Sequence, residues 1–207
     1  MYQAPLPQEY ADLSPEQVAA RIVAAKTKLG KRLVILGHHY QRDEIIRHAD
    51  YRGDSYKLAK DAANHPDAEF IVFCGVHFMA ESADILTPAH QKVILPNLSA
   101  GCSMADMAAY DDALTAWEEI SAAHRGSAVR VVPITYVNSS AAVKAFVGER
   151  GGACCTSGNA REVFEWAMQG GNQPLKPGER VQVLFMPDQH LGRNTARVRG
   201  LRSELDA

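Results

Sequence analysis

The sequence predicts an α/β fold in which short parallel strands alternate with helices. Three observations support this prediction. Apolar runs of strand length, mostly rich in Val, Ile, Leu and Phe, recur along the 207 residues; they are continuous rather than alternating; and helical patterns lie between them. Continuous apolar strands are typical of a parallel sheet that is covered on both faces. The βαβα order then favours parallel strands joined by right-handed crossovers.

The expected elements divide into two similar groups of three strands. Strands are predicted at 32–37, 69–75, 92–96, 128–134, 152–156 and 181–187. Helices are predicted at 14–30, 54–65, 77–86, 110–124, 140–149 and 159–169. The first helix has Ser14 at the capping position and Pro15 at the first helical position. We therefore expect two αβα domains, residues 1–109 and residues 110–207.

The composition is that of an ordinary globular chain, with 46% hydrophobic and 22% charged residues. The net charge of −2 lacks the excess of positive charge that is typical of nucleic-acid binding, so no nucleic-acid partner is expected. No apolar run approaches the roughly 18 residues of a membrane span, and the N-terminus has no signal-peptide pattern. Four cysteines without a CxxC spacing favour reduced thiols. These features predict a cytoplasmic protein without a membrane partner.

Polar or reactive residues follow every predicted strand. The segments are GHHYQ (37–41), GVHFMAE (75–81), PNLSAGCSM (96–104), TYVNSS (135–140), TSGNA (156–160) and PDQHLGR (187–193). Ligands of parallel sheets bind beyond the carboxyl ends of the strands, where helix N-termini favour anions. We therefore expect one site, formed by all six strand ends, for a small molecule with several negative charges.

Several of these residues have a structural and a functional interpretation. His38 and Tyr40 are expected to face the site and His39 the other way, because alternate residues of an extended segment share a face. Tyr136 suits either the core or the site. The following residues are either helix caps or site residues: His77, Ser139, Ser140, Ser157 and Asn159.

Cys102 follows a glycine and precedes a predicted helix start, where a thiolate is stabilised. It therefore suits a nucleophile or a metal ligand, and a structural thiol also fits. Cys154 and Cys155 are adjacent, so they face opposite sides of a strand and cannot both serve one centre. On the residues alone, a hydrolase or transferase with Cys102 as nucleophile and His38 as base is one hypothesis. A dicarboxylate-binding module without turnover is another.

Seven segments, in one order and with compatible spacings, resemble quinolinate synthase from about residue 15 to 196. They are GHHYQ, GDS, CGVHFMAESADIL, LPNLSAGCSMADM, YVNSSAAVKA, CCTSGNA and FMPDQHLGRNTA. The resemblance implies a transferase of pyridine nucleotide (NAD) biosynthesis that condenses iminoaspartate with dihydroxyacetone phosphate. It also implies three αβα domains around a pseudo-threefold axis. A [4Fe–4S] cluster would be held by one cysteine from each domain, with one iron open as a Lewis acid.

The resemblance also implies roles for individual residues. Cys102 matches the first cluster cysteine. Tyr40 and His38 match catalytic positions, and the tyrosine has a suggested role in proton transfer or ring closure. The positions implied to contact the substrate or the bound intermediate are His38, Ser55, Tyr136, Val137, Asn138 and Ser157.

The resemblance covers two of the family's three domains, and we expect the third to be missing. The other cluster cysteines, a His–Glu pair and the residues that bind the triose phosphate are expected to be missing with it. We therefore expect a truncated chain that is inactive alone. Uncovered faces near the strand ends and the helix 189–200 are expected to favour self-association, which leaves a homo-oligomer open. The roles of His77, Asp188 and His190 are also left open.

Overall fold

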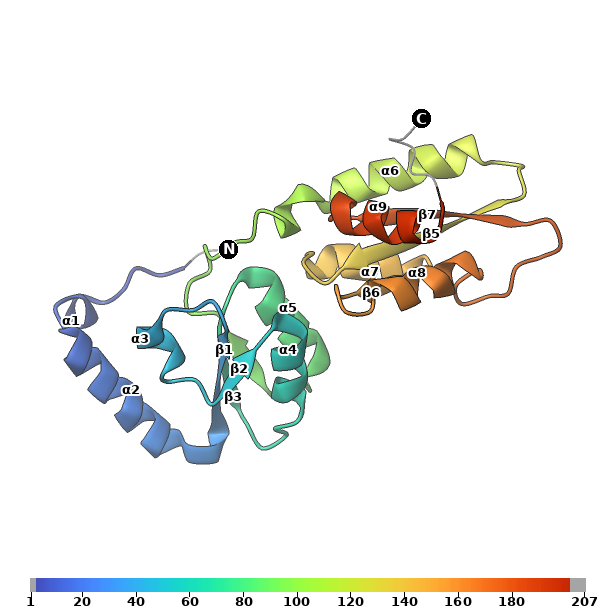
Figure 1. Cartoon of the computed structure of the whole chain (residues 1–207). Helices are drawn as coiled ribbons and strands as arrows, with labels where there is room; N and C mark the ends of the chain where they lie inside the picture. The colour runs from blue at the N-terminus through green and yellow to red at the C-terminus, as the bar shows by residue number, and fades with distance from the viewer. Residues whose placement is uncertain (1–2, 202–207) are drawn as a thin grey trace. The chain divides into compact units, whose positions relative to one another are not determined.

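Two parallel sheets, one in each of two units, form the fold (Figure 1). The computed structural model describes residues 3–201. The first unit covers Met1–Gly101 and the second covers Cys102–Ala207. The α/β class predicted from the sequence is confirmed. None of the helices in the described part of the chain is both long enough and apolar enough to span a membrane.

The first unit contains a four-stranded parallel sheet in the order β2-β1-β3-β4. Its strands are β1 (Leu33–His38), β2 (Tyr51–Gly53), β3 (Phe70–Cys74) and β4 (Lys92–Ile94). Its helices are α1 (Gln8–Ala11), α2 (Pro15–Leu29), α3 (Asp43–Ile46), α4 (Ser55–Ala63) and α5 (His77–Leu86), with a 3₁₀ turn η1 (Gly30–Arg32). Helix α2 begins with a capping box, in which Ser14 and Gln17 satisfy each other's backbone N–H groups.

The core of the first unit joins β1 and β3 to α4. Residues without exposed area in these elements are Leu36, Leu58, Ala59, Ala62, Ile71 and Phe73. Gly37 lets the chain after β1 fold back closely, since a Cβ there would lie 2.4 Å from Cδ1 of Ile46 in α3. The end of β1 is therefore held between the sheet and a short helix, which positions the residues that follow it.

The second unit contains a three-stranded parallel sheet in the order β6-β5-β7. Its strands are β5 (Val129–Tyr136), β6 (Ala153–Cys155) and β7 (Arg180–Met186). Its helices are α6 (Tyr110–Ala123), α7 (Ala141–Glu149), α8 (Ala160–Met168) and α9 (Gln189–Val198), with a 3₁₀ turn η2 (Ala105–Met107).

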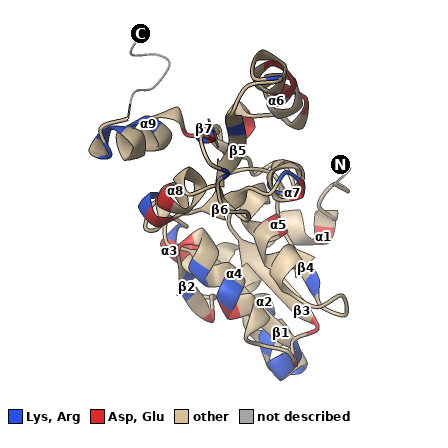
Figure 2. Cartoon of the chain, turned by 90° about the vertical axis from the view of Figure 1, so that its right-hand side faces the viewer, with Lys and Arg blue, Asp and Glu red and all other residues tan. Residues whose placement is uncertain are grey.

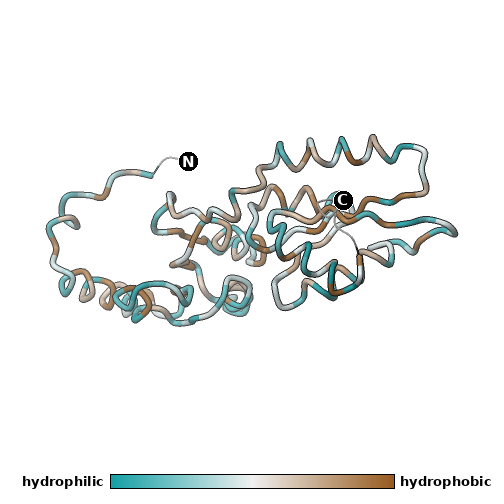
Figure 3. Tube along the Cα trace, turned by 45° about the horizontal axis from the view of Figure 1, so that its top comes forward, coloured by the Kyte–Doolittle hydropathy of each residue, from teal (hydrophilic) through white to brown (hydrophobic). Residues whose placement is uncertain are grey.

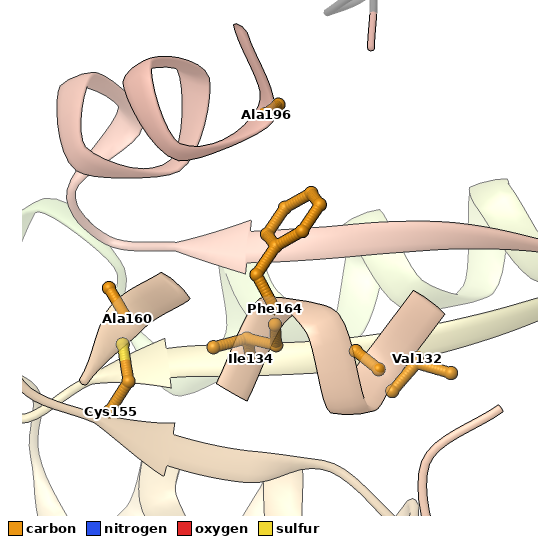
Figure 4. Packing of buried hydrophobic residues seen from close by; sticks show 7 residues of the cluster. Val132, Ile134, Cys155, Ala160, Phe164 and Ala196 are labelled. Carbon is orange, nitrogen blue, oxygen red and sulfur yellow. The ribbon is translucent and has the colours of Figure 1, made fainter. Parts of the chain in front are cut away.

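Helices cover both faces of this second sheet. Phe164 of α8 and Ala196 of α9 pack with Val132 and Ile134 of β5 on one face (Figure 4). On the other face, α6 and α7 pack against Leu184 and Met186 of β7. Alternate residues of β7 therefore enter two different clusters, as a strand of a doubly covered sheet requires. Figure 3 shows that hydrophobic and hydrophilic stretches alternate along the Cα trace.

All six predicted strands and all seven predicted helices, with 189–200 as α9, are present, and no bound shifts by more than two residues. Five short elements are not predicted: α1, η1, α3, β2 and η2. Because of β2, the first unit has four strands rather than the expected three. Positively and negatively charged residues are interspersed along the helices (Figure 2), in keeping with a net charge near zero.

Candidate functional site

His38 is the last residue of β1, and only 6% of its surface is exposed. Its Nδ1 atom is buried and makes no hydrogen bond within the described part of the chain. Burial lowers the pKa of His38 to about 4, the neighbouring His39 adds to the effect, and Asp54 opposes it. The ring is therefore neutral at pH 7, with an unsatisfied polar atom that a ligand can use.

Three rings cluster where β1 ends. The ring centroid of His38 lies 4.2 Å from that of His39 and 4.0 Å from that of Tyr40. Strand geometry ends at His38, so the alternation expected to turn His39 away does not extend to it. The backbone N–H of His39 donates to the carbonyl oxygen of Gly53 over 3.2 Å. Tyr40 is 54% exposed, which leaves it accessible beside the buried imidazole.

Ser55 lies beyond the neighbouring strand β2. Gly53 pairs in register with His38, and Ser55 follows two residues later as the first residue of α4, with 8% exposure. Asp54 caps this helix by accepting a hydrogen bond of 2.8 Å from the N–H of Lys57. The structure thus brings His38 and Ser55 to adjacent strand ends.

His77 begins α5, but it is not the capping residue. Val76 occupies that position, without a side-chain cap. The Nδ1 atom of His77 lies 3.4 Å from Oε1 of Glu81, one turn further along the helix. Its backbone N–H donates to the carbonyl oxygen of Ala100. The ring is half-buried and has a carboxylate partner in its own helix, so the capping interpretation is wrong.

The second unit repeats this geometry with other residues. Tyr136 ends β5 and pairs in register with Cys155 of β6, and Ser157 follows Cys155 by two residues. Tyr136 and Ser157 therefore occupy the places that correspond to His38 and Ser55 in the first unit. In each unit, the first strand ends in a ring and the second is followed by a serine.

Tyr136 is half-buried, and Ser157 lies close enough to act on its hydroxyl. Burial raises the pKa of Tyr136, and the hydrogen bond from Ser157 opposes that effect. Negative charge on Asp188, Cys155 and Cys102 would raise the pKa further. Tyr136 is therefore a neutral hydroxyl at pH 7 that can donate a proton or a hydrogen bond.

Asn138 and Cys102 approach each other in the same unit. Nδ2 of Asn138 donates to Sγ of Cys102 with an N–S distance of 3.9 Å. Val137 between Tyr136 and Asn138 is buried, and its N–H donates to the carbonyl oxygen of Cys155 over 2.8 Å. This backbone bond fixes the turn, so the side chains on either side of Val137 have defined positions.

The helix start expected after Cys102 is wrong. A single 3₁₀ turn, η2, follows, and the N–H of Asp106 donates to the carbonyl oxygen of Cys102 over 3.0 Å. Three residues sum few peptide dipoles, so the stabilisation of a thiolate by an α-helix N-terminus does not apply here.

The candidate helix caps divide between several roles. Ser140 caps α7, since its Oγ accepts a hydrogen bond from the N–H of Val143. Ser139 is fully buried and donates to the carbonyl oxygen of Tyr136 over 2.9 Å. Asn159 occupies the capping position of α8 without a cap bond, and its Oδ1 accepts from the N–H of Thr156. The serines and the asparagine thus mainly hold the turns that present the site residues.

Two acidic residues near the candidate site residues received no role from the sequence. Asp54 acts on His38 by its charge, and Asp188 acts on Tyr136. Asp188 also caps α9 by accepting from the N–H groups of His190 and Leu191 at 3.0 and 2.9 Å. In the sequence, each aspartate stands directly before a helix. That position indicates a helix cap, but it does not indicate that the aspartate lies near the ring of His38 or Tyr136.

The chain does not by itself fit the [4Fe–4S] cluster that the resemblance implies. No group of three or more His, Cys, Asp or Glu residues that could hold a metal occurs within residues 3–201. Burial raises the pKa of Cys74, Cys154 and Cys155, the last to about 12, so these thiols stay protonated at pH 7. Cys102 remains as a single candidate ligand, whereas such a cluster needs at least three thiolates.

Fold and candidate site residues together define a chain of two αβα units, each of which has neutral hydrogen-bonding groups at the ends of its strands. The sequence model of the quinolinate synthetase A protein family matches residues 20–204. The chain therefore belongs to this family.

Curated relatives named quinolinate synthase agree with this assignment. The protein from Corynebacterium glutamicum is 55% identical over 196 residues, which are 95% of this chain and 47% of that protein. The protein from Herpetosiphon aurantiacus is 58% identical over 189 residues, 91% of this chain and 48% of that protein. The protein from Bacillus subtilis is 48% identical over 199 residues, 96% of this chain and 51% of that protein. The chain thus spans about half the length of the curated relatives it matches.

Proposed function

We propose that this chain supplies substrate-binding residues of a quinolinate synthase, which condenses iminoaspartate with dihydroxyacetone phosphate. One observation carries the proposal: His38, which lies in the GHHYQ segment that resembles the family, is buried at a strand end, and its Nδ1 atom has no hydrogen-bond partner among the described residues. A buried polar atom without a partner is costly, and a substrate carboxylate would satisfy it.

In the first unit, His38 and Ser55 bind a carboxylate of iminoaspartate. The neutral imidazole offers one N–H donor rather than a full positive charge. Ser55 adds a hydroxyl and the free N–H groups at the start of α4. We assign to Tyr40 the transfer of a proton to a bound molecule, which is supported by the distance of 4.0 Å between its ring centroid and that of His38.

In the second unit, Tyr136 and Ser157 form a group of hydrogen-bonding side chains that binds a polar group of the substrate or the intermediate. Asn138 and the turn at Val137 complete this group. The raised pKa of Tyr136 keeps its proton available as a donor. We assign Cys102, beside Asn138, as one ligand of the [4Fe–4S] cluster.

The cluster's other thiolates lie outside this chain in our proposal, since Cys102 is the single candidate among the described residues. When bound, such a cluster supplies an open iron as a Lewis acid. For this chain alone we propose binding without turnover. We also propose a cytoplasmic location, which suits four unpaired cysteines, and a domain boundary between residues 101 and 110.

Binding is tested by adding malate, a stable four-carbon dicarboxylate, to the 207-residue chain and recording NMR spectra of the chain. We expect the NMR signals of His38 and Ser55 to shift until binding saturates. Malate should bind about tenfold more weakly to His38→Asn, because roughly one charge-assisted hydrogen bond is lost. His90→Asn is the matched control, because the exposed His90 lies in the same unit and contacts the carbonyl oxygen of Pro66. Equal affinity in His38→Asn and His90→Asn would contradict the proposal.

A second experiment tests the limit placed on the cluster. Anaerobic reconstitution with iron and sulfide is expected to leave less than one cluster per chain, read from iron content and visible absorbance. A stoichiometric cluster that disappears in Cys102→Ser would show that the chain, alone or self-associated, supplies every ligand it needs. The restriction to binding would then be wrong.

A further inference from the structure

A half-buried histidine, His77, lies at the strand end on the other side of His38 from Ser55. The sheet order β2-β1-β3 places β1 between two neighbours, and Gly37 of β1 pairs in register with Cys74, the last residue of β3. Ser55 is the first residue of the helix that follows β2, and His77 is the first residue of the helix that follows β3. His38, at the end of β1, therefore has a serine at one neighbouring strand end and a histidine at the other.

The turn between β3 and α5 fixes the backbone of His77. The N–H of Gly75 donates to the carbonyl oxygen of Phe73 over 3.1 Å, so the chain turns directly after the strand. A Cβ at position 75 would lie 2.9 Å from Cε1 of Phe73 and 3.0 Å from Sδ of Met79, which favours glycine there. The N–H of His77 donates to the carbonyl oxygen of Ala100 over 2.9 Å. His77 thus has a defined place at the strand end.

The carboxylate of Glu81 favours one tautomer of the His77 ring. Oε1 of Glu81 lies 3.4 Å from Nδ1 of His77. A carboxylate beside one ring nitrogen holds the proton of a neutral imidazole on that nitrogen, and the other nitrogen then carries a lone pair. Within residues 3–201, Nε2 of His77 has no hydrogen-bond partner. The ring is 32% exposed, so a ligand can reach this nitrogen and use it as an acceptor.

The three strand ends offer different groups to a ligand. His38 and Ser55 can donate hydrogen bonds, which suits a carboxylate, since an ionised carboxylate only accepts. Nε2 of His77 accepts, so it suits an N–H or O–H group of the ligand and not the carboxylate itself. In iminoaspartate the imine carbon is bonded directly to one carboxylate. A side chain that adjoins the carboxylate-binding pair is therefore close to the imine nitrogen.

We propose that Nε2 of His77 accepts a hydrogen bond from the imine N–H of iminoaspartate, while His38 and Ser55 hold the adjacent carboxylate. This role rests on the proposed function and adds a residue that determines specificity. The corresponding keto acid has a carbonyl oxygen in place of the N–H, so it presents only lone pairs to the lone pair of Nε2. A site that is built for a donor rejects an analogue without one, because the polar atom of the site is then left unpaired. His77 thus selects the imine over the keto acid.

Malate and succinate test this selectivity, because they differ by one hydroxyl group on the carbon beside a carboxylate. Each acid is titrated into the 207-residue chain near pH 8, where an imidazole of ordinary basicity is neutral, and binding is followed by NMR. We expect malate to bind about tenfold more tightly than succinate, which corresponds to one hydrogen bond. In His77→Leu the difference should fall to about threefold or less, and succinate should bind within about threefold of its affinity for the unsubstituted chain.

Three further variants separate recognition from folding. His77→Gln carries an amide oxygen that can accept a hydrogen bond, so it should restore most of the preference for malate. His65→Leu replaces another half-buried histidine of the same unit, whose ring centroid lies 4.8 Å from that of Tyr51, and it should leave the preference unchanged. His38→Asn should weaken the binding of both acids by a similar factor, because both acids carry the carboxylate.

The ¹⁵N signals of the His77 ring provide a measurement on the unsubstituted chain, which does not depend on how His77→Leu folds. We expect the Nε2 signal to shift with malate and to stay in place with succinate. The role of His77 is overturned if this signal responds alike to both acids, if the unsubstituted chain binds both equally, or if His77→Leu keeps the preference for malate. When His38→Asn still weakens both acids, only the role of His77 is wrong. When His38→Asn binds both as tightly as the unsubstituted chain, the proposed function fails as well.

Discussion

His38 makes the stability of the fold depend on pH with a predictable sign. Its pKa falls from 6.5 to about 4 on folding, so the unfolded chain binds more protons between these values. The free energy of unfolding therefore decreases as the pH falls below about 6.5 and levels off below about 4. At about 1.4 kcal/mol per pH unit, the full contribution is about 3 kcal/mol, of which about 2 kcal/mol is lost between pH 7 and pH 4.5.

The assay combines two measurements on the same chain. NMR of isotope-labelled histidine gives the pKa of His38 directly. Urea unfolding near pH 7 and pH 4.5 gives the loss of stability in the unsubstituted chain, in His38→Asn and in the control His90→Asn. Asparagine does not titrate, so His38→Asn should lose about 2 kcal/mol less than the unsubstituted chain when the pH is lowered. The control should lose as much as the unsubstituted chain.

The reasoning would be refuted if His38 titrated near 6.5, or if His38→Asn and the control showed the same pH dependence. The same titration also bears on the proposed function. A bound carboxylate favours the charged imidazole, so malate should raise the pKa of His38 above its value in the free chain. An unchanged pKa in the presence of saturating malate would mean that the carboxylate lies elsewhere.

Two further substitutions follow from the packing. Gly152→Ala should destabilise the chain by about 2 kcal/mol in thermal or urea unfolding, because a Cβ there would lie 2.1 Å from the carbonyl oxygen of Pro133. Gly148→Ala in α7 is its control: the added Cβ meets open space, and the change should stabilise by about 0.5–1 kcal/mol. Ser157→Ala should raise the pKa of Tyr136 further, since it removes the hydrogen bond that opposes burial, and ultraviolet titration of tyrosinate measures this. A lowered pKa would contradict the proposed contact.

Long apolar runs made most of the fold predictable from the sequence. Strands such as β5 and β7 pack into hydrophobic clusters on both faces, so most of their residues are apolar. The missed strand β2 has three residues, Tyr51–Gly53, and includes a charged arginine. It is a strand because its register with β1 supplies hydrogen-bond partners, which is a tertiary effect.

The sequence indicated where the candidate site residues lie but not their physical state. His38 and Tyr136 could be located because each follows an apolar strand. The pKa of His38 depends on depth of burial and on the charges of His39 and Asp54, which no local pattern encodes. The turn after Cys102 was also misjudged, because a short 3₁₀ turn and a helix start share the same residue preferences.

The repeated architecture gives a physical reason for pairing a ring with a serine in each unit. In a parallel sheet, register fixes which residues leave two neighbouring strands side by side, and here His38 meets Gly53 as Tyr136 meets Cys155. A residue two positions further then lies at or near the start of the next helix, where free N–H groups favour anions. Ser55 and Ser157 hold this position in the first and second unit, respectively. The ring supplies a hydrogen bond that burial shields from water. The serine adds a second hydrogen bond from the adjacent strand end. Each pair suits one carboxylate, and this is the physical argument, separate from family membership, for the substrate class proposed above.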